Sequence, residues 1–296
     1  MSDRVLLSPD VSSLADLGAA APDDLFEPAL LVTGGRALCL HEEPARRTFR
    51  VPLPGTPDAQ GNLPERPRAA GTGWLRIDVF RGQAWESVRL RWTRPRSSSV
   101  AARHWNLACH LLAAGVAVPR PVALIEHGRG LVPHSCLVTR ELEGWVPLGE
   151  WLVRSNGGAR KPGLTSVGAC LARLFHSRAW FPRLALDDLL LEDRPTTEGA
   201  EARDDDCAAL TLERMRAQQA SRADLTARGL RLARLPSVAL GRMSGGRLVG
   251  RIAPRRRLQL LERLCNEAQQ RASLTDSERR RVWVPALALE GAGVRA

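Results

Sequence analysis

The chain has 296 residues, of which 44% are hydrophobic, so it is long enough for one large domain or for two lobes that each bury a core. This composition excludes global disorder, and no apolar run reaches the length of about eighteen residues that a transmembrane helix needs. The net charge of +11 predicts attraction to anionic partners, although charge alone identifies none of them. The amino terminus lacks a charged-then-apolar leader, so we expect a cytoplasmic protein.

Six scattered cysteines lack the paired spacing of a zinc or redox site, which predicts buried, reduced thiols. Nearly all of the positive charge is arginine, because Lys161 is the only lysine in the chain.

The amino-terminal part is predicted to be mostly β. Residues 1–24 are polar and rich in Ala and Asp, which indicates a loosely held lead-in. Gly34-Gly35 predicts the turn of a hairpin over residues 29–40, and the Pro and Gly residues of 54–73 predict a long surface loop. Alternation of apolar and polar residues predicts further strands at 47–53, 74–80 and 87–92.

A helical period begins at Val100 and ends at Gly115, which predicts a helix with a glycine stop. The face expected to be buried carries Trp105, Ala108, Cys109, Leu112 and Ala113. Two antiparallel strands of the same sheet are predicted at 116–126 and 135–142. Further helices are predicted at 148–154, 164–177 and 255–272. The short arginine runs at 255–257 and 279–281 predict solvated helix starts or exposed loops.

A β-rich first part followed by an α-rich second part predicts an α+β protein with two lobes, at residues 25–143 and 144–296, and a cleft between them. The most informative segment is Leu171–Leu191, which predicts a helix, a tight loop containing proline and a short apolar strand. This order is typical of a kinase catalytic loop, which needs an aspartate as base and a second oxygen ligand for the metal. Arg183 stands at the first of these positions, and a guanidinium can only donate protons in hydrogen bonds. The loop is therefore predicted to lack its base.

Three segments carry a resemblance to a known family. Arg103–Ala123 contains Arg-His-Trp followed by a Gly-Val turn with Pro-Arg-Pro, Ser135–Leu142 is a strand before a break, and Leu171–Leu191 is the loop described above. Together they resemble the Kdo/WaaP lipopolysaccharide kinase family, a bacterial branch of the protein-kinase-like superfamily that phosphorylates sugars of the lipopolysaccharide inner core. The resemblance spans roughly residues 74–264. It implies a bilobal protein-kinase-like fold with a β-rich N-lobe and an α-helical C-lobe.

The resemblance also implies functional positions, and most of them are substituted in this sequence. Arg91 stands where the family has the strand lysine that holds the α- and β-phosphates, and His104 stands where the glutamate partner of that lysine lies. Arg183 replaces the base. Thr211, in a predicted strand at Leu210–Arg214, stands where the family has its metal-binding aspartate, and it is a poor substitute for that carboxylate. The hinge residues whose backbone would pair with adenine are Arg140, Glu141 and Leu142.

Two carboxylates of the loop allow alternative interpretations. Asp187 and Asp188 stand where the family loop approaches the metal, so Asp188 is a candidate ligand for a divalent cation held with a nucleotide. The structural alternative is that both cap a turn exposed to water. A shift of a few residues in the alignment would instead let Asp187-Asp188, or the acidic residues 204–206, supply the carboxylates of an active site.

The substitutions favour a pseudokinase that binds an anionic ligand, such as a lipopolysaccharide core glycan or a nucleotide, in the cytoplasm or peripherally at the inner membrane. The family implies ATP and Mg²⁺ as cofactors, but the motifs that would hold them are not intact. One alternative is an active ATP-dependent kinase of a core sugar, with Arg91 on phosphate and Asp187 or Asp188 as base or metal ligand. Another is salt-sensitive, non-specific nucleic-acid binding, since no zinc-finger or RNA-recognition motif predicts a specific nucleic-acid partner.

Overall fold

The computed structural model describes residues 4–28, 31, 37–53, 73–81, 99–127, 134–142, 144–155, 157–192, 236–243 and 245–288. The turn predicted at Gly34-Gly35, nearly all of the loop predicted at 54–73 and the strand predicted at 87–92 lie outside these residues. The chain forms two compact units. The first unit comprises Met1–Cys109 with Pro119–Glu143, and the second comprises His110–Val118 with Gly144–Ala296.

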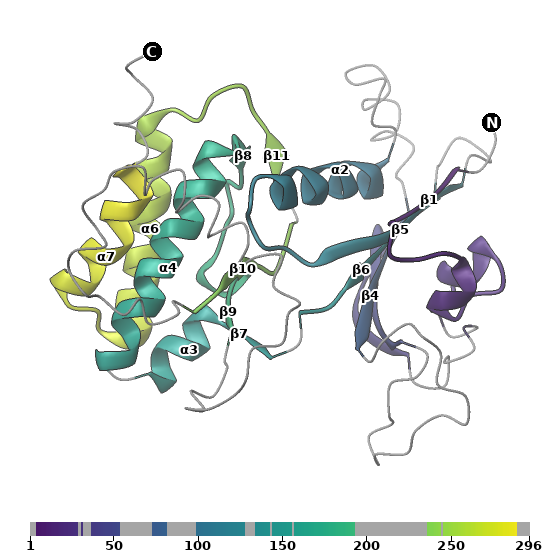
Figure 1. Ribbon diagram of the computed structural model, residues 1–296, viewed down its shortest axis with the longest axis horizontal. Coiled ribbons are helices and arrows are strands. Elements are labelled where there is room, and N and C mark those ends of the chain that lie inside the picture. Colours follow the sequence, from purple (N-terminus) through teal and green to yellow (C-terminus); the bar gives the residue numbers. More distant parts are fainter. Residues whose placement is uncertain are drawn as a thin grey trace, which may run out of the picture. The chain divides into compact units, whose positions relative to one another are not determined.

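The first unit is built on a six-stranded antiparallel sheet, which confirms a β-rich amino-terminal region (Figure 1). The strand order is β1-β5-β6-β4-β3-β2, so β4 lies between β3 and β6 in the middle of the sheet. The strands predicted from alternation at 47–53 and 74–80 are confirmed as β3 and β4, and the pair predicted after the helix is confirmed as β5 and β6. The strands are β1 (Arg4–Leu7), β2 (Leu38–Glu43), β3 (Arg46–Pro52), β4 (Trp74–Arg81), β5 (Arg120–His127) and β6 (His134–Arg140).

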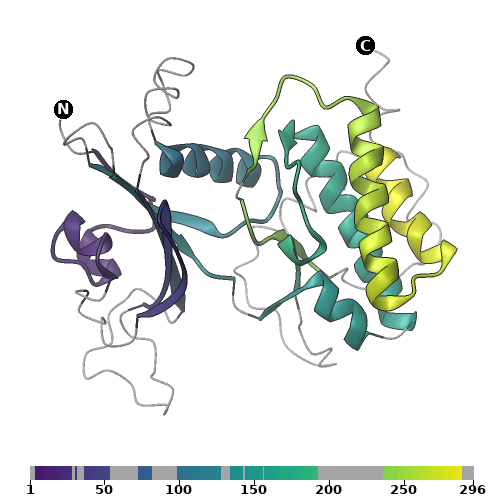
Figure 2. The same ribbon diagram turned by 180° about the vertical axis from the view of Figure 1, so that it is seen from behind.

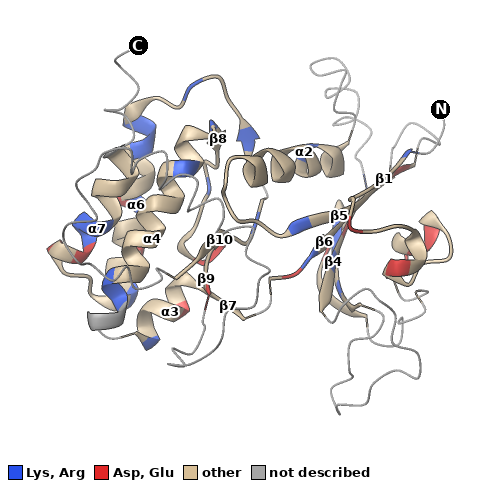
Figure 3. Ribbon diagram, viewed as in Figure 1, with Lys and Arg blue, Asp and Glu red and all other residues tan. Residues whose placement is uncertain are grey.

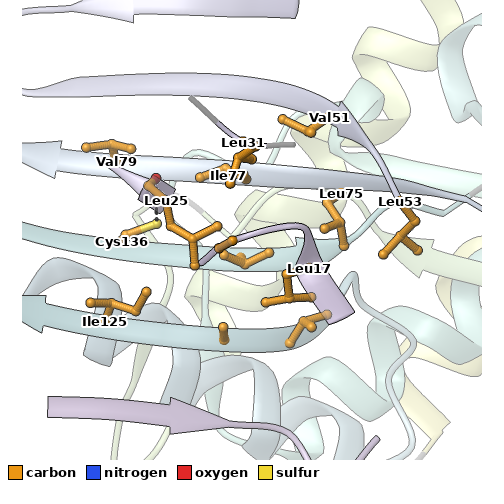
Figure 4. Packing of buried hydrophobic residues seen from close by; sticks show 14 residues of the cluster. Leu17, Leu25, Leu31, Val51, Leu53, Leu75, Ile77, Val79, Ile125 and Cys136 are labelled. Carbon is orange, nitrogen blue, oxygen red and sulfur yellow. Dashed lines mark hydrogen bonds between the residues drawn. The ribbon is translucent and has the colours of Figure 1, made fainter. Parts of the chain in front are cut away.

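The expectation of a loosely held lead-in over residues 1–24 is wrong for the part of that segment that the structure describes. Strand β1 pairs with β5, and two 3₁₀ helices follow, η1 (Leu14–Leu17) and η2 (Pro22–Leu25). Leu17 and Leu25 are buried against one face of the sheet (Figure 4). Burying a leucine side chain contributes about 1.5–3 kcal/mol, so a few apolar residues hold this otherwise polar segment in place.

Helix α2 (Val100–Ala113) lies on the other face of the sheet and ends, as predicted, at Gly115, whose φ of 73° is left-handed (Figure 2). The predicted buried face was correct only in part, because the exact rotation of the helix depends on the sheet beneath it. Ala108 is buried, but Cys109, Leu112 and Ala113 are exposed. The cluster between helix and sheet consists of Phe80, Ala101, Ala102, Leu124 and Leu137.

The second unit is mainly helical, which confirms an α-rich carboxyl-terminal part (Figure 1). The three helices predicted there are confirmed, whereas the last helix was not predicted as such. Within the described residues, no helix combines the length and the apolar character that crossing a bilayer requires. The helices are α3 (Leu148–Arg154), α4 (Gly157–His176), α6 (Pro254–Ala272) and α7 (Asp276–Ala288).

Short strands complete the second unit and frame one loop. Strand β9 is the central strand of a three-stranded sheet, with β7 and β10 on either side. Strands β8 and β11 form a separate antiparallel pair. The bounds are β7 (Trp145–Pro147), β8 (Ala179–Trp180), β9 (Leu189–Glu192), β10 (Val238–Leu240) and β11 (Arg247–Leu248).

The end of α2 and the segment after it are fixed within the second unit by three hydrogen bonds. His110 Nε2 lies 2.7 Å from the carbonyl oxygen of Ser177, and Arg173 Nη1 donates to the carbonyl of Gly115 at 3.1 Å. The backbone N–H of Leu240 donates to the carbonyl of Ala117 at 2.8 Å. The end of β10 is therefore held from two sides, by this segment and by β9.

The five cysteines in the described part of the chain are free, as expected of reduced thiols. Burial was predicted for all of them but holds for three. Burial raises the pKa of the Cys170 thiol to about 11, which keeps it protonated and unreactive at neutral pH. Cys136 and Cys265 are also buried, whereas Cys39 and Cys109 are exposed.

Gly168 in α4 provides a test of helix packing. A Cβ at this position would lie 2.6 Å from the carbonyl oxygen of Val282 and 2.9 Å from that of Arg281, both in α7. Gly-to-Ala changes inside helices normally stabilise by about 1 kcal/mol. Here the added methyl group overlaps backbone that cannot rotate away, so we expect Gly168→Ala to lower the free energy of unfolding by about 1–3 kcal/mol.

Chemical denaturation measures this difference. The matched control is Gly250→Ala, since a Cβ at Gly250 would meet no atom within 4 Å. We expect this control to stay within about 0.5 kcal/mol of the wild type. A Gly168→Ala protein as stable as the wild type would disprove the close approach of α4 and α7.

Candidate functional site

The loop between β8 and β9 is the candidate catalytic loop. Its surroundings confirm the predicted order of helix, proline-containing loop and apolar strand, and a 3₁₀ helix, η5 (Leu186–Asp188), closes it. Phe181 and Leu184 are buried and anchor the loop in the core, whereas Pro182 and Arg183 are exposed. The loop thus presents Arg183 to solvent on a rigid base.

Arg183 makes no hydrogen bond or ion pair with any residue that the structure describes. Its guanidinium remains protonated at every ordinary pH and has no lone pair with which to accept a proton. At this place in the loop it can hold an anion, but it cannot deprotonate a hydroxyl group.

Helix α6 holds the loop through one stripe of charged side chains spaced four residues apart. Arg263 donates from Nη1 to the carbonyl of Pro182 at 2.9 Å and from Nη2 to that of Leu184 at 2.8 Å. The backbone N–H of Leu186 donates to Glu267 Oε2 at 3.1 Å. These contacts satisfy backbone N–H and C=O groups that have no hydrogen-bond partner within a helix or strand. Sequence reasoning missed them, although the charge spacing in α6 was a usable signal.

Asp187 is engaged by the same stripe. Arg271 Nη1 lies 2.7 Å from Asp187 Oδ1, and Arg271 Nη2 lies 3.2 Å from Glu267 Oε1. The pair lies against Gly149 of α3, where a Cβ would overlap atoms of both Arg271 and Asp187. Asp187 therefore joins the loop to α6, which agrees with a structural role for this carboxylate.

Asp188 is the more enclosed of the two loop carboxylates. Its Oδ2 accepts the backbone N–H of Ala185 at 2.9 Å, which agrees with a turn-capping role. Its Oδ1 lies 3.7 Å from Nε of Arg242, a residue that follows β10. Sequence reasoning missed Arg242, because no local pattern connects it with the loop.

The predicted hinge residues are the last residue of β6, Arg140, and the two residues that follow it. Arg140 is exposed, and Glu141 and Leu142 are half-buried. The N–H of Glu141 donates to the carbonyl of Trp74 at 2.8 Å, and its Oε2 accepts from Arg50 Nε at 2.6 Å. The backbone N–H of Glu141 is thus already bonded within the sheet and is not free to pair with a base.

A buried carboxylate lies on the face of the sheet that α2 covers. Asp78 of β4 accepts hydrogen bonds at Oδ1 from Arg46 Nη2 at 2.9 Å and from Thr48 Oγ1 at 2.6 Å. Its Oδ2 lies 3.4 Å from Arg76 Nε. Burial by itself would raise the pKa of Asp78, but Arg76 and Arg46 outweigh it, so the pKa lies below its ordinary value.

His104 of α2 lies beside this cluster. Its ring makes an edge-to-face contact with Phe80, with centroids 5.4 Å apart. Burial, reinforced by the charge of Arg46, lowers the pKa of His104 from 6.5 to about 4, although Asp78 opposes that shift. His104 is therefore neutral at physiological pH and carries no charge with which to pair an arginine.

Two predicted site residues, Arg91 and Thr211, lie outside the described residues, as do the acidic residues 204–206. The expected strand at Leu210–Arg214 also falls there. Among the described residues, the strand that pairs with β9 on the side away from β7 is β10. No strand was predicted from the sequence at the position of β10, and the prediction at Leu210–Arg214 stays a prediction.

Magnesium requires oxygen ligands in near-octahedral geometry, usually with carboxylates among them. The described part of the chain contains no group of three His, Cys, Asp or Glu side chains that could hold a metal ion. Next to the loop, Asp188 is the one carboxylate not bound by α6, and it already faces Arg242. Mg²⁺ does not fit the residues described at this site.

The loop, the paired strands around it and the β-rich region before it define a kinase-like fold. The profile of the lipopolysaccharide kinase (Kdo/WaaP) family matches residues 69–226, more than half of the chain, so the chain belongs to that family. A solved structure titled "WaaP in complex with acyl carrier protein" is similar in fold, with a TM-score of 0.57 and 16% identity over 96% of this chain and 89% of that one. A comparison with curated protein sequences found no match.

Removal of the Arg263 side chain tests whether α6 holds the loop. We expect Arg263→Met to lower the free energy of unfolding by about 1–2 kcal/mol, because two loop carbonyls lose their donors. Hydrogen exchange of the loop amides should become faster in the same variant. The control is Arg256→Met, which removes an exposed arginine of the same helix. Equal exchange in both variants would show that the loop does not depend on α6.

His104 is expected to make stability depend on pH. The unfolded chain binds a proton at this residue near pH 6.5 and the folded chain near pH 4, so between these values acid favours unfolding. As the pH falls through that window, His104→Gln should keep up to about 3 kcal/mol of stability that the wild type loses. Asp78 affects stability at lower pH. Its lowered pKa stabilises the folded state, and this stabilisation is lost only as the pH falls through the pKa of Asp78 in the folded protein.

Urea denaturation at a series of pH values measures this difference. The control is His176→Gln, because His176 is exposed at the end of α4 and its variant should keep the slope of the wild type. If His104→Gln and the wild type lose stability in parallel on acidification, the buried neutral state of His104 is refuted.

Proposed function

We propose that this chain is a pseudokinase of the lipopolysaccharide kinase family, which binds a phosphate-bearing ligand and transfers no phosphate. The ligand class is a phosphorylated core glycan of lipopolysaccharide or a nucleotide. The observation that carries the proposal is the chemistry of the loop between β8 and β9. Its exposed side chain is Arg183, and both of its carboxylates face arginines.

Phosphotransfer depends on positioning and on charge stabilisation, and it needs a group that orients and deprotonates the attacking hydroxyl. Asp187 is held by Arg271, and Asp188 accepts the Ala185 N–H beside Arg242. A carboxylate engaged in these contacts must break them before it can orient and deprotonate a hydroxyl group. Neither residue is well prepared to act as a displaced base.

Binding of an anion is supported by the distribution of charge. The segment 236–258 carries six arginines and no acidic residue, and its basic positions along β11 and the start of α6 are blue in Figure 3. Arginine presents a planar set of donors that matches a phosphate group. We place this binding in the cytoplasm or peripherally at the inner membrane.

The test is a phosphotransfer assay with the full chain, radiolabelled ATP, Mg²⁺ and lipopolysaccharide core oligosaccharide. We expect no transfer above the level without protein, while an active lipopolysaccharide kinase assayed in parallel transfers phosphate. In the binding arm, phosphorylated oligosaccharide should raise the melting temperature and its dephosphorylated form should not, because only a bound ligand stabilises the folded state.

Transfer that disappears in Asp188→Ala would overturn the proposal in favour of an active kinase.

A nucleic-acid competitor tests the third alternative, which is non-specific nucleic-acid binding. Displacement of the oligosaccharide by short duplex DNA at low salt, but not at physiological salt, is expected of non-specific attraction to a basic surface.

A further inference from the structure

The end of β10 brings an arginine to the catalytic loop. Leu240 lies opposite Leu189 in the antiparallel pair, and the N–H of Gly241 donates to the carbonyl of Asp188 at 2.7 Å. This bond fixes the chain immediately before Arg242. As a result, Nε of Arg242 lies 3.7 Å from Oδ1 of Asp188.

The two members of this pair differ in exposure. The Asp188 side chain is 15% exposed, whereas that of Arg242 is 62% exposed. A mostly buried carboxylate needs a cation or hydrogen-bond donors, and Arg242 and the Ala185 N–H supply them. The Nη groups of Arg242 make no hydrogen bond with a described residue, so the outer edge of the guanidinium is available to a ligand.

The strand end itself leaves little room for a second carboxylate. The described residues 236–243 contain no Asp or Glu. A Cβ at Gly241 would lie 2.7 to 3.2 Å from three side-chain atoms of Leu190, so an acidic side chain there requires Leu190 to move. A kinase metal site needs oxygen ligands from both the loop and the strand end. Here one carboxylate is present and a fixed cation faces it.

We propose that the guanidinium of Arg242 takes the place of the metal ion, so that this chain binds a phosphate group without Mg²⁺. This inference rests on the proposed function, since it states how the same site holds a phosphate-bearing ligand. Asp188 orients the guanidinium through Nε, and the Nη edge donates to phosphate oxygens in the bidentate geometry that arginine favours. A divalent cation near the ligand adds no partner that the site can use.

Isothermal titration of the full chain tests this, with ATP and with inorganic tripolyphosphate as a probe that has no base or sugar. We expect the dissociation constant in EDTA to equal that in Mg²⁺ to within about twofold, or to be smaller in EDTA, because Mg²⁺ neutralises the phosphates. Arg242→Gln should weaken binding by about tenfold or more, as expected for loss of a charge-assisted hydrogen bond.

The matched control is Arg280→Gln, which removes the same charge from an exposed arginine of α7, outside the basic segment. It should change the dissociation constant by less than about twofold, since an exposed charge that does not contact the ligand is largely screened at physiological salt. Arg242→Lys keeps the charge but not the planar donors, and we expect it to lie between the wild type and Arg242→Gln. Equal melting temperatures of the variants without ligand establish that each is folded.

Binding that requires Mg²⁺ and disappears in EDTA would overturn this inference, as would equal losses in Arg242→Gln and Arg280→Gln or no binding of either probe. The phosphotransfer assay distinguishes this failure from that of the proposed function. Mg²⁺-dependent binding without transfer leaves the pseudokinase proposal standing, whereas transfer to the oligosaccharide removes it.

Discussion

The attachment of one loop to one helix is the constraint on which the functional argument depends. A stripe of α6 bonds the loop between β8 and β9 at Pro182, Leu184, Leu186 and Asp187. A loop bound at so many places cannot easily rotate a different side chain into the position of Arg183. The chemistry of the loop therefore depends on the residue at that position, because a local rearrangement does not bring a different side chain there.

The fold and the catalytic chemistry depend on different residues, so the proposed function requires no loss of the fold. Packing of Phe181, Leu184 and Leu186 stabilises the loop, and each buried side chain of this size contributes about 1.5–3 kcal/mol. An exposed side chain such as Arg183 contributes little to folding, since surface substitutions usually change stability by less than about 0.5 kcal/mol. A kinase-like fold therefore tolerates the loss of its base at almost no cost in stability.

Local sequence patterns predicted most of the elements, because the signals were contained in short windows. Alternation located β4, and a helical period located α2. Patterns of this kind failed where tertiary contacts decide the outcome. The lead-in is ordered because Leu17 and Leu25 reach a core made by distant strands, and the buried face of α2 was rotated from the predicted one.

The candidate site could be predicted only in part for the same reason. Leu171–Leu191 is contiguous, so its loop was recognised from residue types and their order. Arg242 lies beyond residues 193–235, and only the pairing of β9 with β10 places it beside Asp188. No window of the sequence contains both members of that pair. The stripe on α6 was visible as a spacing, but not as a contact with the loop.

Asp78 and Asp188 are two largely enclosed carboxylates, and each of them faces an arginine. Two unit charges about 4 Å apart attract by about 1 kcal/mol in water and by about 4 kcal/mol near a partly buried protein surface. With Arg242 more than half exposed, the lower part of that range applies to Asp188. A divalent ion would have to displace this attraction and give up its own water ligands, while gaining one carboxylate. A covalently attached cation loses no comparable entropy on taking its place, so arginine is the favoured occupant if Asp188 is the only acidic ligand, as it is among the described residues around the loop.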